Sequence, residues 1–152
     1  MGQCMERAVQ LAIENVAQGG SSFGAVLVQE GKIIAEGINE LHSTFDGSSH
    51  AELNAIRHAQ KTLQTNDLSN CTMYASGQPC PICLTSMHFV GVTDIYYSQS
   101  VDEATNIGLG ASKAMYQDFT KPNESSGIVM QYMSLEEGQQ NPMRLWVQKH
   151  EK

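Results

Sequence analysis

The sequence predicts an α/β domain in which helices pack on a mixed β-sheet. Short apolar runs typical of strands alternate with longer stretches in which apolar residues recur every three or four positions, as on one face of a helix. The length of 152 residues matches one domain, because domains contain roughly 100–200 residues. No repeat, low-complexity tract or linker divides the chain, so we expect residues 1–152 to form a single domain.

A helix and a hairpin are expected in the first part of the chain. Apolar positions recur through residues 1–18 with the period of a helix, which is expected to end near Gly19. The side chains expected along its apolar face are Met5, Ala8, Val9, Ala12, Ile13 and Val16. Two apolar runs, 24–28 and 32–35, flank a three-residue turn that contains Gly31, a pattern typical of a β-hairpin.

The same patterns predict the elements that follow position 38. A polar loop is expected over 39–49, helices over 50–63, 81–90, 104–119 (interrupted by Gly108 and Gly110) and 140–150, and strands over 72–75, 94–97 and 127–133. Strands that alternate with helices in this way favour layers of helices on a sheet.

The charges argue against nucleic-acid partners. Nine Lys and Arg against sixteen Asp and Glu give a formal net charge of −7, and the basic residues are scattered singly. A protein that binds nucleic acid usually carries a basic patch that neutralises phosphates, so tRNA is disfavoured as a partner.

Membrane insertion and export are also disfavoured. The longest apolar run, 25–28, is far shorter than the ~20 residues that span a bilayer, and the first residues lack the pattern of a signal peptide. We therefore expect a cytoplasmic protein with no membrane partner. In a reducing compartment, the four cysteines more often serve metal binding or catalysis than disulfides.

One constellation carries most of the chemical information. His50 and Glu52 are followed by Cys80 and Cys83 in a Cys-x-x-Cys pair, which can bring two thiolates to one ion. A catalytic zinc ion takes three protein ligands and leaves its fourth position to water. His50, Cys80 and Cys83 supply three such ligands, so the sequence predicts one Zn²⁺ per chain.

Local geometry supports this interpretation. Pro81 suits the first turn of a helix, which places Cys80 at the helix cap, where the helix dipole favours a thiolate. Glu52 lies two residues beyond His50, about 200° round a helix, so it cannot easily bind the same ion beside His50. It could instead move protons at the metal-activated water.

Three other interpretations remain open at this point. The Cys-x-x-Cys pair could be a redox pair of the thioredoxin type. Glu52 could cap its helix, because it follows Ser49 by three positions, the spacing of a capping box. The zinc site could be structural, with Cys71 or His88 as a fourth ligand.

The combined pattern His-x-Glu…Pro-Cys-x-x-Cys resembles the signature of the zinc-dependent cytidine and deoxycytidylate deaminase superfamily. The resemblance implies a three-layer α/β/α, cytidine-deaminase-like fold with a mixed five-stranded sheet. It implies an aminohydrolase that deaminates a cyclic amidine and releases ammonia. In that chemistry a zinc-activated hydroxide is the nucleophile, Glu52 is the proton shuttle, and His50, Cys80 and Cys83 are the metal ligands.

Within this superfamily the chain looks most like the small bacterial guanine deaminases, which are related to the tRNA adenosine deaminases. The stretch Phe23-Gly24-Ala25-Val26 resembles the segment whose Phe packs on the substrate ring, and Asn39 matches an Asn that hydrogen-bonds the substrate. Ala51 is expected to join Phe23 and Asn39 in substrate binding. The resemblance also implies a homodimer, with a C-terminal segment that could be exchanged between subunits.

The substrate itself is left open by three departures from the pattern. Gln78 stands where family members commonly have Glu before the Pro-Cys, and residues 108–112 lack the acidic residue with which guanine deaminases recognise guanine. The C-terminal aromatic residue of the guanine deaminases also has no evident match in residues 147–152. We therefore expect a free nucleobase-like heterocycle: guanine or a related aminopurine, pterin or triazine. Adenosine-to-inosine deamination in tRNA is the alternative, and a non-catalytic domain with a structural zinc is the second alternative.

Overall fold

The structure is a computed structural model in which residues 2–119 and 130–151 of the 152-residue chain are described. Backbone contacts divide the chain into two units, Met1–Thr120 and Lys121–Lys152, and each is described by itself. Within the described ranges, no helix is both long enough and apolar enough to cross a membrane.

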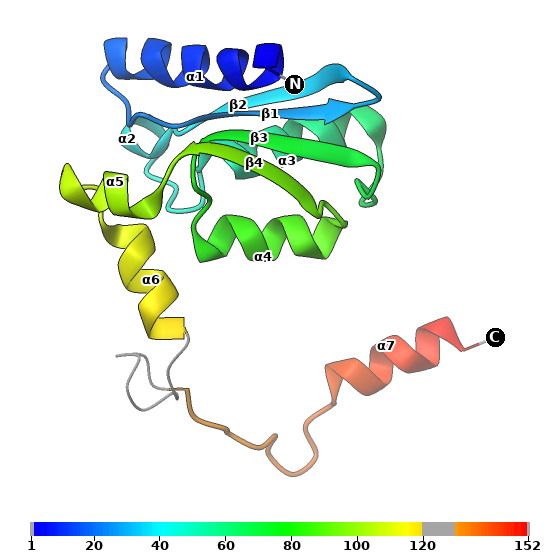
Figure 1. Cartoon of the computed structure of the whole chain (residues 1–152). Helices are drawn as coiled ribbons and strands as arrows, with labels where there is room; N and C mark the ends of the chain where they lie inside the picture. The colour runs from blue at the N-terminus through cyan, green and yellow to red at the C-terminus, as the bar shows by residue number, and fades with distance from the viewer. Residues whose placement is uncertain (1, 120–129, 152) are drawn as a thin grey trace. The chain divides into compact units, whose positions relative to one another are not determined.

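The first unit is built on a four-stranded sheet in the order β2-β1-β3-β4 (Figure 1). β1 (Gly24–Gln29) pairs antiparallel with β2 (Lys32–Ile38) in the predicted hairpin, and it also pairs antiparallel with β3 (Cys71–Gly77). β3 pairs parallel with β4 (Asp94–Gln99). The sheet is therefore mixed, as the sequence predicts.

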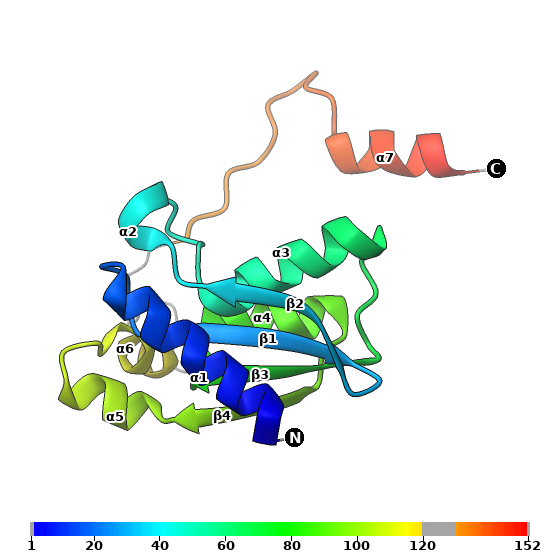
Figure 2. The ribbon, with the colours of Figure 1, turned by 90° about the horizontal axis from the view of Figure 1, so that it is seen from above.

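Helices cover both faces of this sheet (Figures 1 and 2). α1 (Gly2–Ala17) lies on one face, and α3 (Ala51–Leu63) and α4 (Pro81–Val90) lie on the other. The three-layer α/β/α architecture is confirmed. The helices expected over 50–63 and 81–90 are confirmed almost to the residue.

Three further helices complete the first unit. α2 (Leu41–Thr44) is one turn within the loop that was expected to be irregular. α5 (Val101–Asn106) and α6 (Ala111–Phe119) are separated around the two glycines, as the interrupted pattern predicts. The second unit contains α7 (Pro142–His150), the last helix expected from the sequence.

The expected fifth strand over 127–133 is not found in the described residues. Positions 127–129 lie outside them, and 130–133 form no regular structure. Met130 and Tyr132, which lie in the expected strand, are 75% and 90% exposed, so neither is buried against a sheet within the described structure. The expectation of five strands is wrong for the described part of the chain, which forms four.

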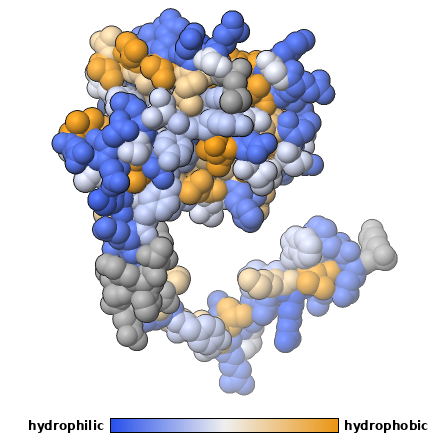
Figure 3. Space-filling model, viewed as in Figure 1, coloured by the Kyte–Doolittle hydropathy of each residue, from blue (hydrophilic) through white to orange (hydrophobic). Residues whose placement is uncertain are grey.

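The buried face of α1 also differs from the expected one. Ile13 and Val16 are 64% and 52% exposed, and apolar side chains are visible on the surface over α1 in Figure 3. The buried residues are Ala8, Leu11, Ala12 and Asn15. A Cβ on Gly24 would lie 2.5 Å from the Ala8 carbonyl oxygen, so close approach at small residues sets the rotation of the helix.

A second close approach positions α3 against β2. A Cβ on Gly37 would collide with the carbonyl oxygen of Ala51 and would lie 2.5 Å from the backbone nitrogen of Ala55. The helix can reach this position because Gly37 has no side chain. The approach fixes where α3 begins, and therefore where His50 lies.

Replacing Gly37 by Ala should lower the free energy of unfolding by about 1–3 kcal/mol, the usual cost of overpacking a close-packed contact. The measurement is denaturant unfolding of the purified protein. Gly47→Ala is the matched control, because a Cβ at Gly47 meets nothing within 4 Å. Equal stability of the two variants would contradict the packing argument.

Candidate functional site

Two helix N-termini converge on the predicted ligands. His50 is the N-cap of α3 and Cys80 is the N-cap of α4, while Cys83 lies in the first turn of α4. Pro81 occupies the first turn, as predicted. Because a helix N-terminus carries partial positive charge, this placement favours a thiolate at Cys80, the cap of α4.

The three side chains have the spacing of a tetrahedral zinc site. His50 Nδ1 lies 3.4 Å from Cys80 Sγ and 3.5 Å from Cys83 Sγ, and the two sulfurs are 3.7 Å apart. Zinc bond lengths imply about 3.6 Å between nitrogen and sulfur and about 3.8 Å between two sulfurs in a tetrahedron. The donor set and its spacing therefore fit one zinc ion.

The fourth ligand position has no protein candidate among the described residues. The group of His, Cys and acidic side chains close enough to share one ion contains only His50, Cys80 and Cys83. Cys71 is buried at the start of β3 with its Sγ against Asn70, and His88 is exposed. Three protein ligands are the number found in catalytic zinc sites, whereas structural sites are usually closed by four.

The negative charge at the ligand cluster favours the binding of a cation. The hydrogen bond with Cys83 lowers the pKa of Cys80 to about 4, and the hydrogen bond with Cys80 raises the pKa of His50. The Cys83 thiol has a strongly raised pKa, because it hydrogen-bonds Cys80 and is buried. A thiolate is thus held at Cys80 even without a metal ion.

Glu52 is a buried carboxyl group beside the ligands. Burial raises its pKa to about 6, against the opposing effect of a hydrogen bond with Cys83. His50, and not Ser49, is the N-cap of α3, and that cap makes no side-chain hydrogen bond. The capping-box interpretation of Glu52 is therefore wrong. A carboxyl group with a pKa near neutrality suits general acid–base catalysis.

A cavity of about 220 Å³ opens on these residues. Of the predicted site residues, it is lined by Phe23, Asn39, His50, Ala51, Glu52 and Cys80. Asn39 is oriented by its Oδ1, which accepts a hydrogen bond from the Leu41 N–H at 3.1 Å. Its amide NH₂ has no partner within the described residues, so it can donate to a ligand in the cavity.

Sequence reasoning missed Asn15, which holds two segments of the cavity wall together. Its Nδ2 donates to the carbonyl oxygens of Ser21 and Asn39, both at 2.8 Å. Its position on α1 gave a signal, because it follows Leu11 by four residues and therefore lies on the buried stripe. A buried amide there needs partners, and its partners are the cavity loops.

Side chains from the first turns of α3 hold the loop that precedes His50. Asn54 Nδ2 donates to the Ile38 carbonyl oxygen at 2.8 Å and to Ser49 Oγ at 3.1 Å. Arg57 donates to Ser48 Oγ at 2.8 Å and to Asn54 Oδ1 at 2.9 Å. These bonds orient the residue that carries the imidazole.

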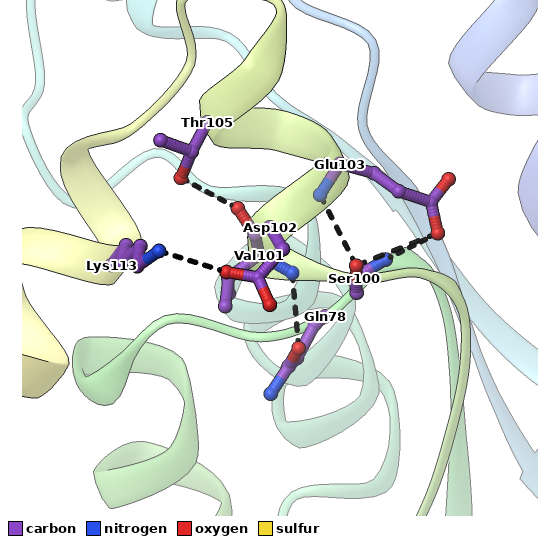
Figure 4. Close-up of polar contacts among 7 residues, drawn as sticks. All are labelled: Gln78, Ser100, Val101, Asp102, Glu103, Thr105 and Lys113. Carbon is purple, nitrogen blue, oxygen red and sulfur yellow. Dashed lines mark hydrogen bonds and ion pairs between the residues drawn. The ribbon is translucent and has the colours of Figure 1, made fainter.

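Two of the departures noted in the sequence lie at the cavity. Gln78 lines it, and its Oε1 accepts the backbone N–H of Val101 at 3.0 Å (Figure 4). From residues 108–112, Leu109, Ala111 and Ser112 reach the lining. Among the described lining residues, Glu52 is the sole acidic one, so no second carboxylate faces a ligand from this segment.

Comparison with known proteins identifies close relatives. Residues 2–99 match the family described as the cytidine and deoxycytidylate deaminase zinc-binding region. The chain is 37% identical over 143 residues to a guanine deaminase of Bacillus subtilis (strain 168), covering 93% of this chain and 90% of that protein. It is 27% identical over 114 residues to a tRNA-specific adenosine deaminase of Aquifex aeolicus, covering 75% of this chain and 72% of that protein.

Solved structures show the same relationship. The crystal structure of guanine deaminase from Bacillus subtilis superposes with a TM-score of 0.88 at 35% identity, covering 97% of this chain and 93% of that one. A guanine deaminase from Nitrosomonas europaea gives a TM-score of 0.66 at 28% identity, covering 69% and 62%. The fold of the chain is thus that of the first relative over nearly its whole length.

The purified protein should contain one zinc ion per chain, measured by elemental analysis after gel filtration. Cys83→Ser should lose most of this zinc, because a hydroxyl is a much poorer ligand than a thiolate. Cys4→Ser is the matched control and should keep the full content, since Cys4 lies outside the ligand group. Full zinc occupancy in the Cys83 variant would rule out the assigned ligand.

Proposed function

The chain belongs to the cytidine and deoxycytidylate deaminase family, and from this membership we propose that it deaminates a free nucleobase-like heterocycle. It is a zinc-dependent deaminase that acts on a nucleobase. In the proposed reaction, water adds to the ring carbon that carries the exocyclic amine. The carbon–nitrogen bond then breaks, and the products are the oxo heterocycle and ammonia. The proposal rests mainly on the three ligands at tetrahedral spacing beside buried Glu52, in the wall of one cavity.

His50, Cys80 and Cys83 would hold the zinc ion, which when bound would lower the pKa of water to roughly 7 and so supply a nucleophile at neutral pH. Glu52 would accept one proton from the attacking water and deliver it to the substrate ring nitrogen. It would then take the proton of the newly added hydroxyl group and deliver it to the amine, which leaves as ammonia. Its raised pKa, about 6, lets the carboxyl group both take up and release a proton near neutrality.

The remaining cavity residues orient the heterocycle. The ring of Phe23 offers a flat apolar surface for stacking, and the free amide NH₂ of Asn39 donates to an acceptor on the substrate. Ala51 begins α3, so its backbone N–H is one of the unpaired donors at a helix start, and its small side chain leaves room for the ring.

The relatives support guanine or a related aminopurine as the substrate. Two of them are named as guanine deaminases, and one of these covers nearly the whole chain. A pterin or a triazine with the same amino-substituted C=N group satisfies the same chemistry. The proposal includes these heterocycles because the chain has Gln78 and lacks an acidic residue in 108–112, two differences from the guanine deaminase pattern.

Two alternatives are disfavoured by particular observations. Deamination of adenosine in tRNA requires a surface that binds phosphates, whereas the chain has a net charge of −7. A purely structural zinc usually has four protein ligands, and the described residues offer three.

We further propose that residues 1–152 form one deaminase domain, located in the cytoplasm and assembled as a homodimer. The alignment across 93% of the chain supports a single domain. Within the second unit, Met143 and Trp146 on α7 are 81% and 61% exposed, and such apolar side chains favour burial against another chain. An exchanged C-terminal segment would supply that burial.

Glu52→Gln should retain one zinc per chain but lower kcat by about 10²–10⁴-fold, because the amide cannot carry a proton. Ammonia release measures kcat, and elemental analysis measures the zinc. Glu6→Gln, on the exposed side of α1, is the matched control and should change neither. Near-normal turnover in the Glu52 variant would refute its role as proton shuttle.

The substrate class is tested by an ammonia-release screen over guanine, adenine, cytosine, aminopterins and aminotriazines. We expect release from one or more of the purine-like heterocycles. In parallel, tRNA should show no inosine, and any gel shift should vanish as salt rises, as expected of weak phosphate contacts. Inosine in tRNA, with no release from any free heterocycle, would establish the alternative instead.

A further inference from the structure

A second cavity, of about 320 Å³, lies beside the cavity that holds the predicted ligands. The two cavities are neighbours because they have five lining residues in common: Phe23, Gly77, Gln78, Leu109 and Ser112. The other walls of the second cavity come from the end of β4 and from α5. The second cavity therefore adjoins the space beside the metal ligands.

The lining of this second cavity combines apolar side chains with several polar ones and is almost uncharged. Its polar side chains are the hydroxyls of Ser22, Ser100 and Ser112, the amides of Gln78, Gln99 and Asn106, and the carboxylate of Glu103. No lysine, arginine or histidine is present among the described residues that line it. The side chains of Ser22, Gln99 and Asn106 make no hydrogen bond within the described structure, so their polar groups are available to a ligand.

Glu103 gives this lining its one formal charge. Its Oε1 accepts the backbone N–H of Ser100 at 3.2 Å in a capping box, which leaves Oε2 as a free acceptor (Figure 4). The neighbouring Lys113 is paired with Asp102 at 3.0 Å, so its charge is compensated. A free carboxylate oxygen accepts hydrogen bonds from hydroxyl groups and repels phosphate.

Gln78 stands where the two cavities meet. Its Oε1 is occupied by the Val101 N–H, so its Nε2 is the group left to contact a ligand (Figure 4). The amide therefore offers a donor at the junction. A glutamate here would offer a negatively charged acceptor instead. The residue at position 78 therefore decides whether hydrogen-bond acceptors or donors of the ligand are favoured where the two cavities meet.

The sizes of the cavities favour a ligand that uses both. The cavity at the metal ligands, about 220 Å³, is smaller than the roughly 300–1,000 Å³ typical of small-molecule sites. It suits a heterocycle alone. A bulky substituent on the ring needs further space, and the adjoining cavity offers it.

We propose that the second cavity is a subsite for a hydroxylated substituent on the base, such as ribose, so that the protein deaminates ribonucleosides as well as free bases. Hydroxyl groups both donate to Glu103 and accept from the amides, which matches this lining. A 5′-phosphate finds no cation in it and meets a carboxylate, so nucleoside monophosphates are poor substrates. This inference rests on the proposed deaminase function.

The test compares guanine, guanosine and guanosine 5′-monophosphate, and the corresponding adenine series, as substrates of the zinc-loaded protein. We expect kcat/KM for the nucleoside of the preferred base to equal or exceed that for the base, and the monophosphate to be at least about tenfold poorer. Turnover of the base with a nucleoside tenfold or more slower would overturn the subsite and leave the deaminase proposal intact. Absence of ammonia from every compound would overturn the proposed function itself.

Two variants locate the effect in the second cavity. Ala104→Leu, which narrows that cavity alone, should lower the ratio of kcat/KM for nucleoside over base by at least about tenfold, the effect of a misfit of methylene size. Ala114→Leu on the exposed side of α6 is the matched control and should leave the ratio unchanged.

Glu103→Gln keeps the capping box, because Gln also serves at this position, but it removes the charge. This variant should raise the ratio of kcat/KM for the monophosphate over kcat/KM for the nucleoside by about threefold to tenfold. Glu6→Gln is its control. If neither the Ala104 nor the Glu103 variant changes these ratios, the subsite is excluded even if nucleosides are deaminated.

Discussion

The close packing of α3 on β2 at Gly37 is the constraint on which the site depends. Because no side chain intervenes there, the first turn of α3 lies against the strand, and the residue just before it, His50, is held at the edge of the sheet. β3 ends at Gly77 in the same sheet, and the chain needs only a short connection to begin α4 at Pro81. The imidazole and the two sulfurs meet because β2 and β3 flank β1, run in the same direction and so end on the same side of the sheet, where the two helices start.

Once these helix starts are in place, the charges of the site follow from their surroundings. The partial positive charge at both helix N-termini favours the thiolate that the Cys83 hydrogen bond stabilises at Cys80. Burial acts on Glu52 in the opposite direction, by disfavouring its charged form. The Cys80 thiolate, which can bind the metal, and the Glu52 carboxyl group, which can carry a proton, thus lie close together. Their pKa values shift in opposite directions because hydrogen bonding dominates at Cys80 and burial dominates at Glu52.

The sequence predicted the ligands well because they depend on local geometry: Pro81 sets the start of a helix, and a Cys-x-x-Cys spacing at that start has few outcomes. It predicted the layers well for the same reason, since periodicity reports single elements. The rotation of α1 was missed, because it is decided by the contact of Ala8 with Gly24, which lie far apart in the chain. The contact of Gln78 with Val101 was missed for the same reason. The strand expected over 127–133 was inferred from its own residues, which do not report whether a partner strand lies beside them.

The side-chain amide of Asn15 links α1 to the wall of the cavity, and its contacts restrict which residues could replace it. Its Nδ2 donates to two loop carbonyl oxygens, while its Oδ1 is buried without a partner in the described structure. Aspartate would lose the donors and bury a charge. Leucine would remove the donor to the Asn39 carbonyl oxygen and leave the Ser21 carbonyl oxygen with the Phe23 N–H alone. Glutamine would not fit beside Gly20, where a Cβ would already lie 2.6 Å from the Asn15 side chain. A residue on the opposite face of the sheet from α3 and α4, remote in sequence from every ligand, therefore helps to hold the wall of the cavity.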